Sequence, residues 1–239
     1  MNAKFDDLIL NYSYQFKLSD KAPVKIDLRI DKQTNTLLPP ENADLPFWAD
    51  LEYQQCPNCP LNSEESPHCP VARNLIPLID ICSLIESYAE MDVRITTFDR
   101  VISAHTSAQR AVSSVLGLIM ATSPCPFTGY LKPMARFHVP LSSEEEAIYR
   151  TTSMYLLAQY FRSKRGLSHA YDINGLKTIY HDLQTVNRAM AQRLKAASKE
   201  DSAVNAVILL ELLTRAVTWS IEDGLEEIAY LFESYTEES

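Results

Sequence analysis

The chain has 239 residues, of which 46% are hydrophobic, so it can bury a sizeable core in one large domain or one domain with a small appendage. Its formal net charge of −9 argues against a general affinity for nucleic-acid phosphates, which requires clustered lysine and arginine. The opening residues, MNAKFDDLIL, lack the charged region, apolar run and cleavage site of a secretory signal, and we therefore expect a cytoplasmic protein.

The N-terminal segment predicts a small antiparallel sheet. Apolar and polar residues alternate over residues 12–18 and 24–30, as in half-buried strands. Turn-forming residues follow both stretches, and residues 36–38 supply a third short strand. We expect residues 1–55 to form this β meander, with Trp48 packing between the sheet and the loop that follows.

A cysteine loop follows, with the sequence CPNCPLNSEESPHCP at residues 56–70. Each of its three cysteines precedes a proline, and a downstream cysteine has the same setting in Ser-Pro-Cys-Pro. The chain holds only 13 prolines, so this shared setting groups four of the five cysteines into one class of site. These four are Cys56, Cys59, Cys69 and Cys125. Cysteines clustered in this way in a cytoplasmic protein favour metal binding or thiol chemistry over disulfides.

The spacing of the four cysteines predicts a shared metal. A Cys-x-x-Cys turn points two thiolates at one ion, the nine residues from Cys59 to Cys69 can return a third, and Cys125 would complete the set. Iron–sulfur clusters and zinc both accept four thiolates. Iron–sulfur is favoured, because Cys-Pro steps occur in bacterial ferredoxin loops and because Pro60 stands where zinc knuckles commonly place glycine. His68 could replace one thiolate, although a histidine beside a ligand is more often a neighbour.

These motifs carry a resemblance. The runs CPNCPL from Cys56 and CPVA from Cys69, with MATSPCP from Met120 and MARFH from Met134, resemble a family of uncharacterised bacterial proteins. The resemblance covers most of the chain and implies that the chain forms one structural unit. It implies no activity, so the grouping of Cys125 with the loop rests on its Cys-Pro setting alone.

The chain after residue 70 is mainly helical in pattern. Apolar residues recur at helical spacing over residues 71–85, where Pro77 should kink the helix and Cys82 lies on the apolar stripe as a buried structural cysteine. Residues 91–98 alternate like a strand. Residues 107–122 predict an apolar helix.

Three longer helices are predicted in the C-terminal half. The first opens at Ser142 with a capping-box spacing to Glu145 and ends at Gly166, and the second follows Asp172. The third begins near Asp201 and is apolar nearly all round, so it must be central to a bundle or buried in a dimer.

The third helix is a poor match to a membrane span, because it contains Glu211 and Arg215. Charge is also uneven along this half of the chain. Residues 132–195 hold ten basic and five acidic side chains, whereas residues 199–239 hold two basic and ten acidic. We expect oppositely charged helices or solvated helix faces.

A second segment of chemical interest lies near Cys125. Arg136 and His138 alternate, so on an extended backbone they would face the same way with Phe137 opposite. They are candidate catalytic residues, since arginine can bind an anion and histidine can exchange a proton. The alternative is that Arg136 pairs with a local carboxylate and His138 is a hydrogen-bonded, partly buried residue.

The sequence therefore predicts an α+β fold, with a small antiparallel β meander over residues 1–55 and the cysteine loop and helical bundle over residues 56–239. Three functions are compatible with it. The first is an iron–sulfur protein with a redox or sensor role. The second is a zinc-stabilised interaction module that binds an unidentified protein or a second copy of the chain. The third is an enzyme with Arg136 and His138 beside the metal.

Overall fold

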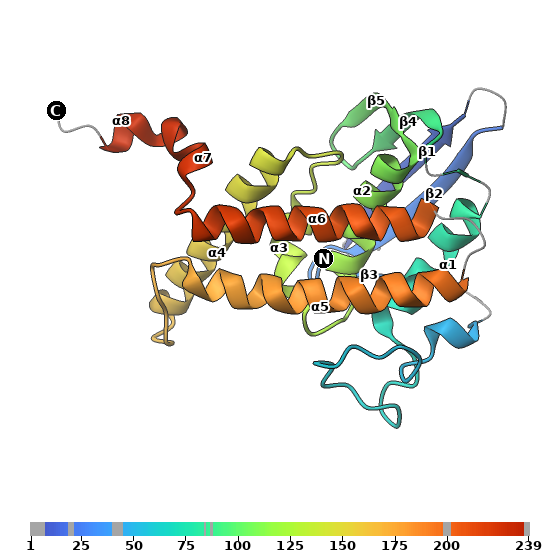
Figure 1. Cartoon of the computed structure of the whole chain (residues 1–239), viewed down its shortest axis with the longest axis horizontal. Coiled ribbons are helices and arrows are strands. Elements are labelled where there is room, and N and C mark those ends of the chain that lie inside the picture. Colours follow the sequence, from blue (N-terminus) through green and yellow to red (C-terminus); the bar gives the residue numbers. More distant parts are fainter. Residues whose placement is uncertain are drawn as a thin grey trace, which may run out of the picture.

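The computed structural model describes residues 8–18, 22–39, 45–83, 85–86, 88–197 and 202–236. Its architecture is α+β, as the sequence predicts: an antiparallel sheet at the N-terminal end, followed mostly by helices (Figure 1). The strands are β1 (Ile9–Lys17), β2 (Val24–Asp31), β3 (Thr36–Leu37), β4 (Glu90–Thr96) and β5 (Val101–Ser107).

The strand order in the sheet is β3-β2-β1-β4-β5, and all neighbouring pairs are antiparallel. The first three strands form the expected meander. Strand β4 confirms the strand that was predicted from the alternation over residues 91–98. The sheet nevertheless extends beyond the expected 1–55 segment, because β4 and β5 add to the other side of β1. Pairing of β1 on both sides removes an edge that would otherwise expose its backbone groups.

The helices are α1 (Pro70–Cys82), α2 (Ala108–Thr122), α3 (Lys132–Arg136), α4 (Glu144–Lys164), α5 (Asn174–Ala197), α6 (Ser202–Glu222), α7 (Glu226–Ala229) and α8 (Glu233–Thr236), with 3₁₀ turns η2 (Phe47–Ala49), η3 (Thr128–Leu131) and η4 (Tyr230–Phe232). Helix α2 lies between the sheet and α6, and α5 runs along α6 while also contacting α1 and η2. Figure 1 shows α5 and α6 side by side across the molecule, and α7 and α8 extending away from it.

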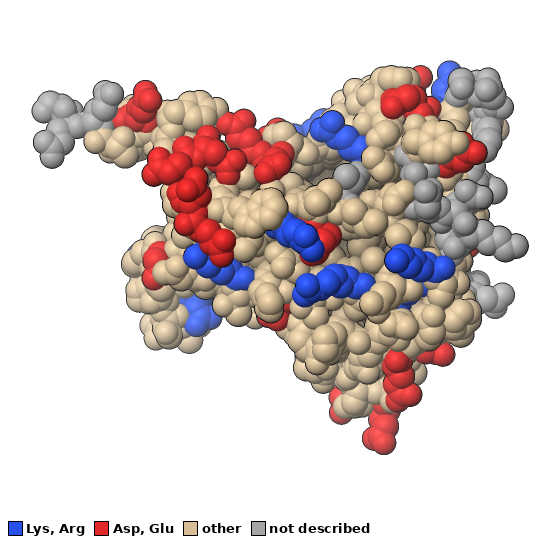
Figure 2. Space-filling view, viewed as in Figure 1, with Lys and Arg blue, Asp and Glu red and all other residues tan. Residues whose placement is uncertain are grey.

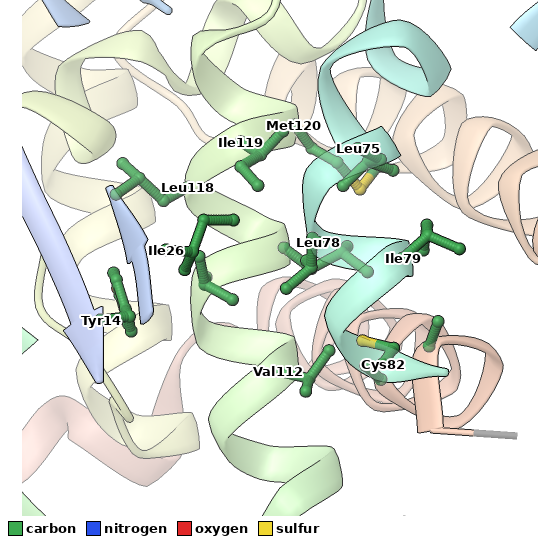
Figure 3. Packing of buried hydrophobic residues seen from close by; sticks show 14 of the residues in the cluster. Tyr14, Ile26, Leu75, Leu78, Ile79, Cys82, Val112, Leu118, Ile119 and Met120 are labelled. Atoms are coloured by element: carbon green, nitrogen blue, oxygen red, sulfur yellow. The ribbon is translucent and has the colours of Figure 1, made fainter. Parts of the chain in front are cut away.

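The core forms where the apolar face of the sheet meets α1 and α2 (Figure 3). Alternation along β1 buries Tyr12, Tyr14 and Phe16, as expected for a strand with one face against helices. Cys82 is fully buried on α1 beside α2, which confirms its prediction as a core cysteine. Pro77 lies inside α1, which continues past it to Cys82.

The long helix α4 begins one residue later than the sequence indicated. Ser143, not Ser142, is the N-cap: its side chain accepts from the Glu146 backbone N–H, and the Glu146 carboxylate accepts from the Ser143 backbone N–H. The run Ser-Ser-Glu-Glu-Glu offers the capping-box spacing twice, so the pattern alone could not choose between the two serines. Gly166 follows the helix with a positive φ of 67°, as predicted for its end.

Helix α6 begins at Ser202, close to the predicted start, while Asp201 itself lies outside the described residues. By length and composition, its segment Ala203–Glu222 is the one helix in the described chain that could cross a membrane. In the structure one face of it packs against α2 and α5, with Ala206 and Val207 buried, whereas Leu212 and Trp219 on another face are 52% and 64% exposed. The helix is therefore not enclosed on all sides within the described chain.

The uneven charge of the sequence appears on the surface. Figure 2 shows acidic side chains gathered near the C-terminal end of α6 and over α7, and basic side chains over α5. A charge pair on α6, Glu211 with Arg215, joins Oε1 to Nε at 3.1 Å. The Arg215 side chain is exposed to solvent, whereas that of Glu211 is mostly covered.

One buried charge connects the helices to the beginning of the cysteine loop. Arg193 of α5 is only 1% exposed. Its Nη1 donates to the carbonyl oxygens of Trp48 at 2.7 Å and Asp50 at 2.6 Å, and its Nη2 donates to that of Leu51 at 2.7 Å. Trp48 is itself buried, which confirms its predicted packing role. The guanidinium therefore holds a segment that has little regular structure of its own.

Replacing Arg193 with methionine should lower the free energy of unfolding by about 2 kcal/mol or more, because it leaves the Trp48 and Leu51 carbonyl oxygens unpaired at about 1–3 kcal/mol each, while the Asp50 carbonyl keeps the Tyr53 N–H. Denaturant unfolding followed by circular dichroism measures this loss. Arg188→Met is the matched control, since Arg188 is exposed on the same helix and bonds only a neighbouring threonine. Equal stability of the two variants would show that the guanidinium contributes nothing.

Candidate functional site

The cysteine loop is closed at its base by backbone pairing. The Cys69 N–H donates to the Ala49 carbonyl at 2.8 Å, and the Leu51 N–H donates to the Pro67 carbonyl at 2.9 Å. An antiparallel bridge between Asp50 and His68 lies between these two bonds. The two limbs of the loop therefore leave and return at one place, next to the Arg193 guanidinium.

The Cys-x-x-Cys segment forms the tight turn that its spacing predicts. The Cys59 N–H donates to the Cys56 carbonyl at 2.9 Å. Asn58, within the turn, donates from Nδ2 to Asp182 Oδ1 of α5 at 3.0 Å. This bond attaches the turn to the same helix that carries Arg193.

Cys69 occupies the N-cap position of α1, and Pro70 follows at the first helical position, where its missing N–H costs no helical hydrogen bond. Burial raises the pKa of the Cys69 thiol, while the backbone amides of Ala72 and Val71 and the Arg193 guanidinium oppose this rise. A negative charge on this sulfur would thus be stabilised by a helix N-terminus and a nearby cation.

Cys125 approaches from the end of α2. Asn74 of α1 is buried and donates from Nδ2 to Ser123 Oγ at 2.9 Å, so α1 is tied to the segment that carries Cys125. The Cys125 carbonyl accepts from the Gly129 N–H at 3.0 Å, which starts the turn into η3. The beginning of α1 and the end of α2 are held together in this way.

Three of the four Cys-Pro cysteines pack on the same core, and the fourth lies within electrostatic range of Cys56. Cys56, Cys69 and Cys125 are half-buried and pack against one hydrophobic core. Burial raises the pKa of the Cys56 thiol to about 12, and negative charge on Cys69, Cys125 and Cys59 adds to the rise. These charge interactions indicate that the other three cysteines lie within electrostatic range of Cys56. All five cysteines lie in the described chain, and none forms a disulfide.

Three further observations concern metal ligands. Within the described residues, no group of three or more histidine, cysteine, aspartate or glutamate side chains is arranged to hold a metal ion directly. Cys82 lies in the core, apart from the half-buried set. The His68 Nδ1 atom lies 3.2 Å from Asp50 Oδ1, without the alignment of a hydrogen bond, so its imidazole is placed against a carboxylate.

The structure corrects the expected geometry of Arg136 and His138. Arg136 is the last residue of α3, not part of an extended segment, because the chain coils before Phe137. The Arg136 guanidinium lies over the Phe98 ring at 5.7 Å from its centroid. His138 lines a cavity between the helices, and neither Arg136 nor a cysteine is among the described residues that line it.

His138 is held as a neutral side chain. Burial, with a further contribution from the nearby Arg150 charge, lowers the pKa of its imidazole to about 3. Its Nε2 is hydrogen-bonded to the Tyr14 hydroxyl. Burial raises the pKa of Tyr14, so the phenol keeps its proton and donates to the ring nitrogen. This arrangement matches the alternative of a hydrogen-bonded, partly buried histidine.

Several residues that support the site were not predicted from the sequence, namely Asn58, Asn74, Asp182 and Arg193. A signal existed for Arg193, which follows Val186 and Met190 at helical spacing and so places a charge on the buried stripe of α5. The contacts of the other three depend on which segments meet, and spacing along the chain does not reveal them.

A family model for a domain of unknown function, DUF6901, matches residues 10–233. The chain therefore belongs to the DUF6901 family, which agrees with the resemblance to an uncharacterised family over most of the chain. No curated protein and no solved structure matches it.

The His138 environment predicts a pH dependence of stability. The pKa of His138 falls from 6.5 in the unfolded chain to about 3 in the folded protein. Between these values only the unfolded chain binds the proton, so the free energy of unfolding should fall as the pH is lowered, by up to about 1.4 kcal/mol per pH unit. Urea unfolding at about pH 7, 6 and 5 measures the slope. His138→Gln should remove this contribution, and an unchanged slope in that variant would contradict it.

Proposed function

We propose that the protein binds a metal cofactor through Cys56, Cys59, Cys69 and Cys125, and that this cofactor is an iron–sulfur cluster with a redox or sensor role. The observation that supports the proposal is the meeting of three separate segments: the Cys-x-x-Cys turn, the start of α1 and the end of α2. Backbone pairing, Asn58 and Asn74 fix the positions of these segments, and negative charge on Cys59, Cys69 and Cys125 acts on Cys56.

The donor set fits such a group. Four thiols are the ligand set that both iron–sulfur clusters and structural zinc sites use. The half-buried position of the thiols shields a bound group from solvent on the side of the core.

The surrounding residues have distinct roles in the proposal. Thiolate ligands carry negative charge, and the Arg193 guanidinium and the α1 N-terminus would stabilise it. Because proline lacks an N–H, the residue after each cysteine cannot donate a hydrogen bond to sulfur. Such hydrogen bonds are one of the factors that set the reduction potential of an iron–sulfur cluster.

A bound cluster would supply electron transfer or a response to oxidation.

The other parts of the proposal rest on the sequence. We infer that the cysteine loop is a defining motif of the family, that the family is bacterial and that the protein works in the cytoplasm. A redox or sensor role implies a partner, which is an unidentified protein or a second copy of the chain. An enzyme site formed by Arg136 and His138 has less support, since the two side chains have separate surroundings.

The test is anaerobic purification of the whole chain with analysis of iron, acid-labile sulfide and zinc, together with a visible absorbance spectrum. Iron and sulfide with absorbance that bleaches on reduction are expected. Cys56→Ser and Cys125→Ser should lose most of the metal. Cys82→Ala is the matched control and should retain it, because Cys82 lies in the core.

The outcomes separate the alternatives. Stoichiometric zinc without sulfide would replace the cluster by the zinc-stabilised interaction module while keeping the same four ligands. Equal metal content in the wild type and in all the cysteine variants would contradict the four-cysteine site itself.

A further inference from the structure

A second candidate site lies among the helices. A cavity of about 490 Å³ is bounded by α2, η3, α3, α4, α5 and α6, a size within the range of small-molecule sites. Its walls are largely apolar, with Leu118, Met134, Leu183 and Leu213 among the lining residues. Leu212 also lines it and is 52% exposed, so the cavity reaches the protein surface at α6.

Two buried polar side chains line this cavity without a partner. Thr128 is 0% exposed and Asn187 is 3% exposed. In the described part of the chain, neither Thr128 Oγ1 nor Asn187 Nδ2 has a hydrogen-bond partner. Buried polar groups in native proteins are nearly always paired, so two unpaired groups in one cavity indicate a bound molecule.

Three other polar side chains of the wall already have hydrogen-bond partners. His138 is bonded to Tyr14, and Tyr180 is bonded to Thr151. Arg150 donates from Nη2 to the carbonyl oxygens of two residues of the α3 segment, Met134 at 3.0 Å and Phe137 at 2.8 Å.

The polar groups available to a ligand are mainly donors. The Asn187 amide nitrogen donates only, and the Thr128 hydroxyl can donate. The wall also carries the charges of two arginines, Arg110 and Arg150, which bond backbone carbonyls, and of one carboxylate, Glu144. This balance favours a hydrogen-bond-accepting, negatively charged head group, while the apolar walls favour a hydrocarbon body.

We propose that this cavity binds a small aliphatic carboxylate, with its chain against the apolar walls and its head group accepting hydrogen bonds from Asn187 and Thr128. The site is independent of the proposed metal centre, since none of the cysteines is among its described lining residues.

Isothermal titration calorimetry of the full-length protein with sodium decanoate tests the proposal, with decanol and methyl decanoate as uncharged probes of the same length. Decanoate should bind at least tenfold more tightly than either uncharged probe. Asn187→Leu and Thr128→Val should each weaken decanoate binding by tenfold or more. Their thermal midpoints without ligand should not fall, because each change removes an unpaired buried polar group.

Thr152→Val is the matched control. Thr152 is also buried with an unpaired Oγ1, but it is not among the residues that line the cavity, so this variant should bind decanoate like the wild type. Three results would overturn the proposal: no binding by the wild type, equal binding of the three probes, or decanoate affinities in Asn187→Leu and Thr128→Val that equal that of Thr152→Val.

Discussion

The arrangement of the cysteine loop depends on the buried guanidinium of Arg193. A charge removed from water is tolerated only when polar groups satisfy it, and here three carbonyl oxygens of the Trp48–Leu51 segment do so. The Asp50 carbonyl also accepts from the Tyr53 N–H, so the carbonyls of Trp48 and Leu51 depend most on the guanidinium. The cation and the loop therefore stabilise each other, and the loop acquires a defined position relative to α5.

Helix α5 supports both candidate sites. Asp182 binds the Cys-x-x-Cys turn, Arg193 binds the base of the cysteine loop, and Asn187 between them lines the cavity. The segment after α2 is shared as well, since Cys125 is followed three residues later by Thr128 of the cavity wall. A displacement of either segment would move groups in both sites, although the two sites use different side chains.

Local patterns predicted most of the secondary structure because they report which face of an element is buried. Alternation identified β1, β2 and β4, and helical spacing identified α2, α4, α5 and α6. Strand β5 was missed because it lies at the edge of the sheet with both faces partly exposed, so its residues do not alternate between apolar and polar. The capping serine of α4 was misplaced by one residue because the sequence repeats the same spacing.

The sequence by itself determined that four cysteines form one class, since each precedes a proline, and that an apolar helix lies near the C-terminus. Only the tertiary structure decided that Cys125 lies near Cys56, that Arg193 holds the loop and that Thr128 and Asn187 face one cavity. The physical reason is that these relations join segments far apart in the chain. They depend on how α1, α2, α5 and α6 pack, and periodicity within one segment carries no information about which other segment will meet it.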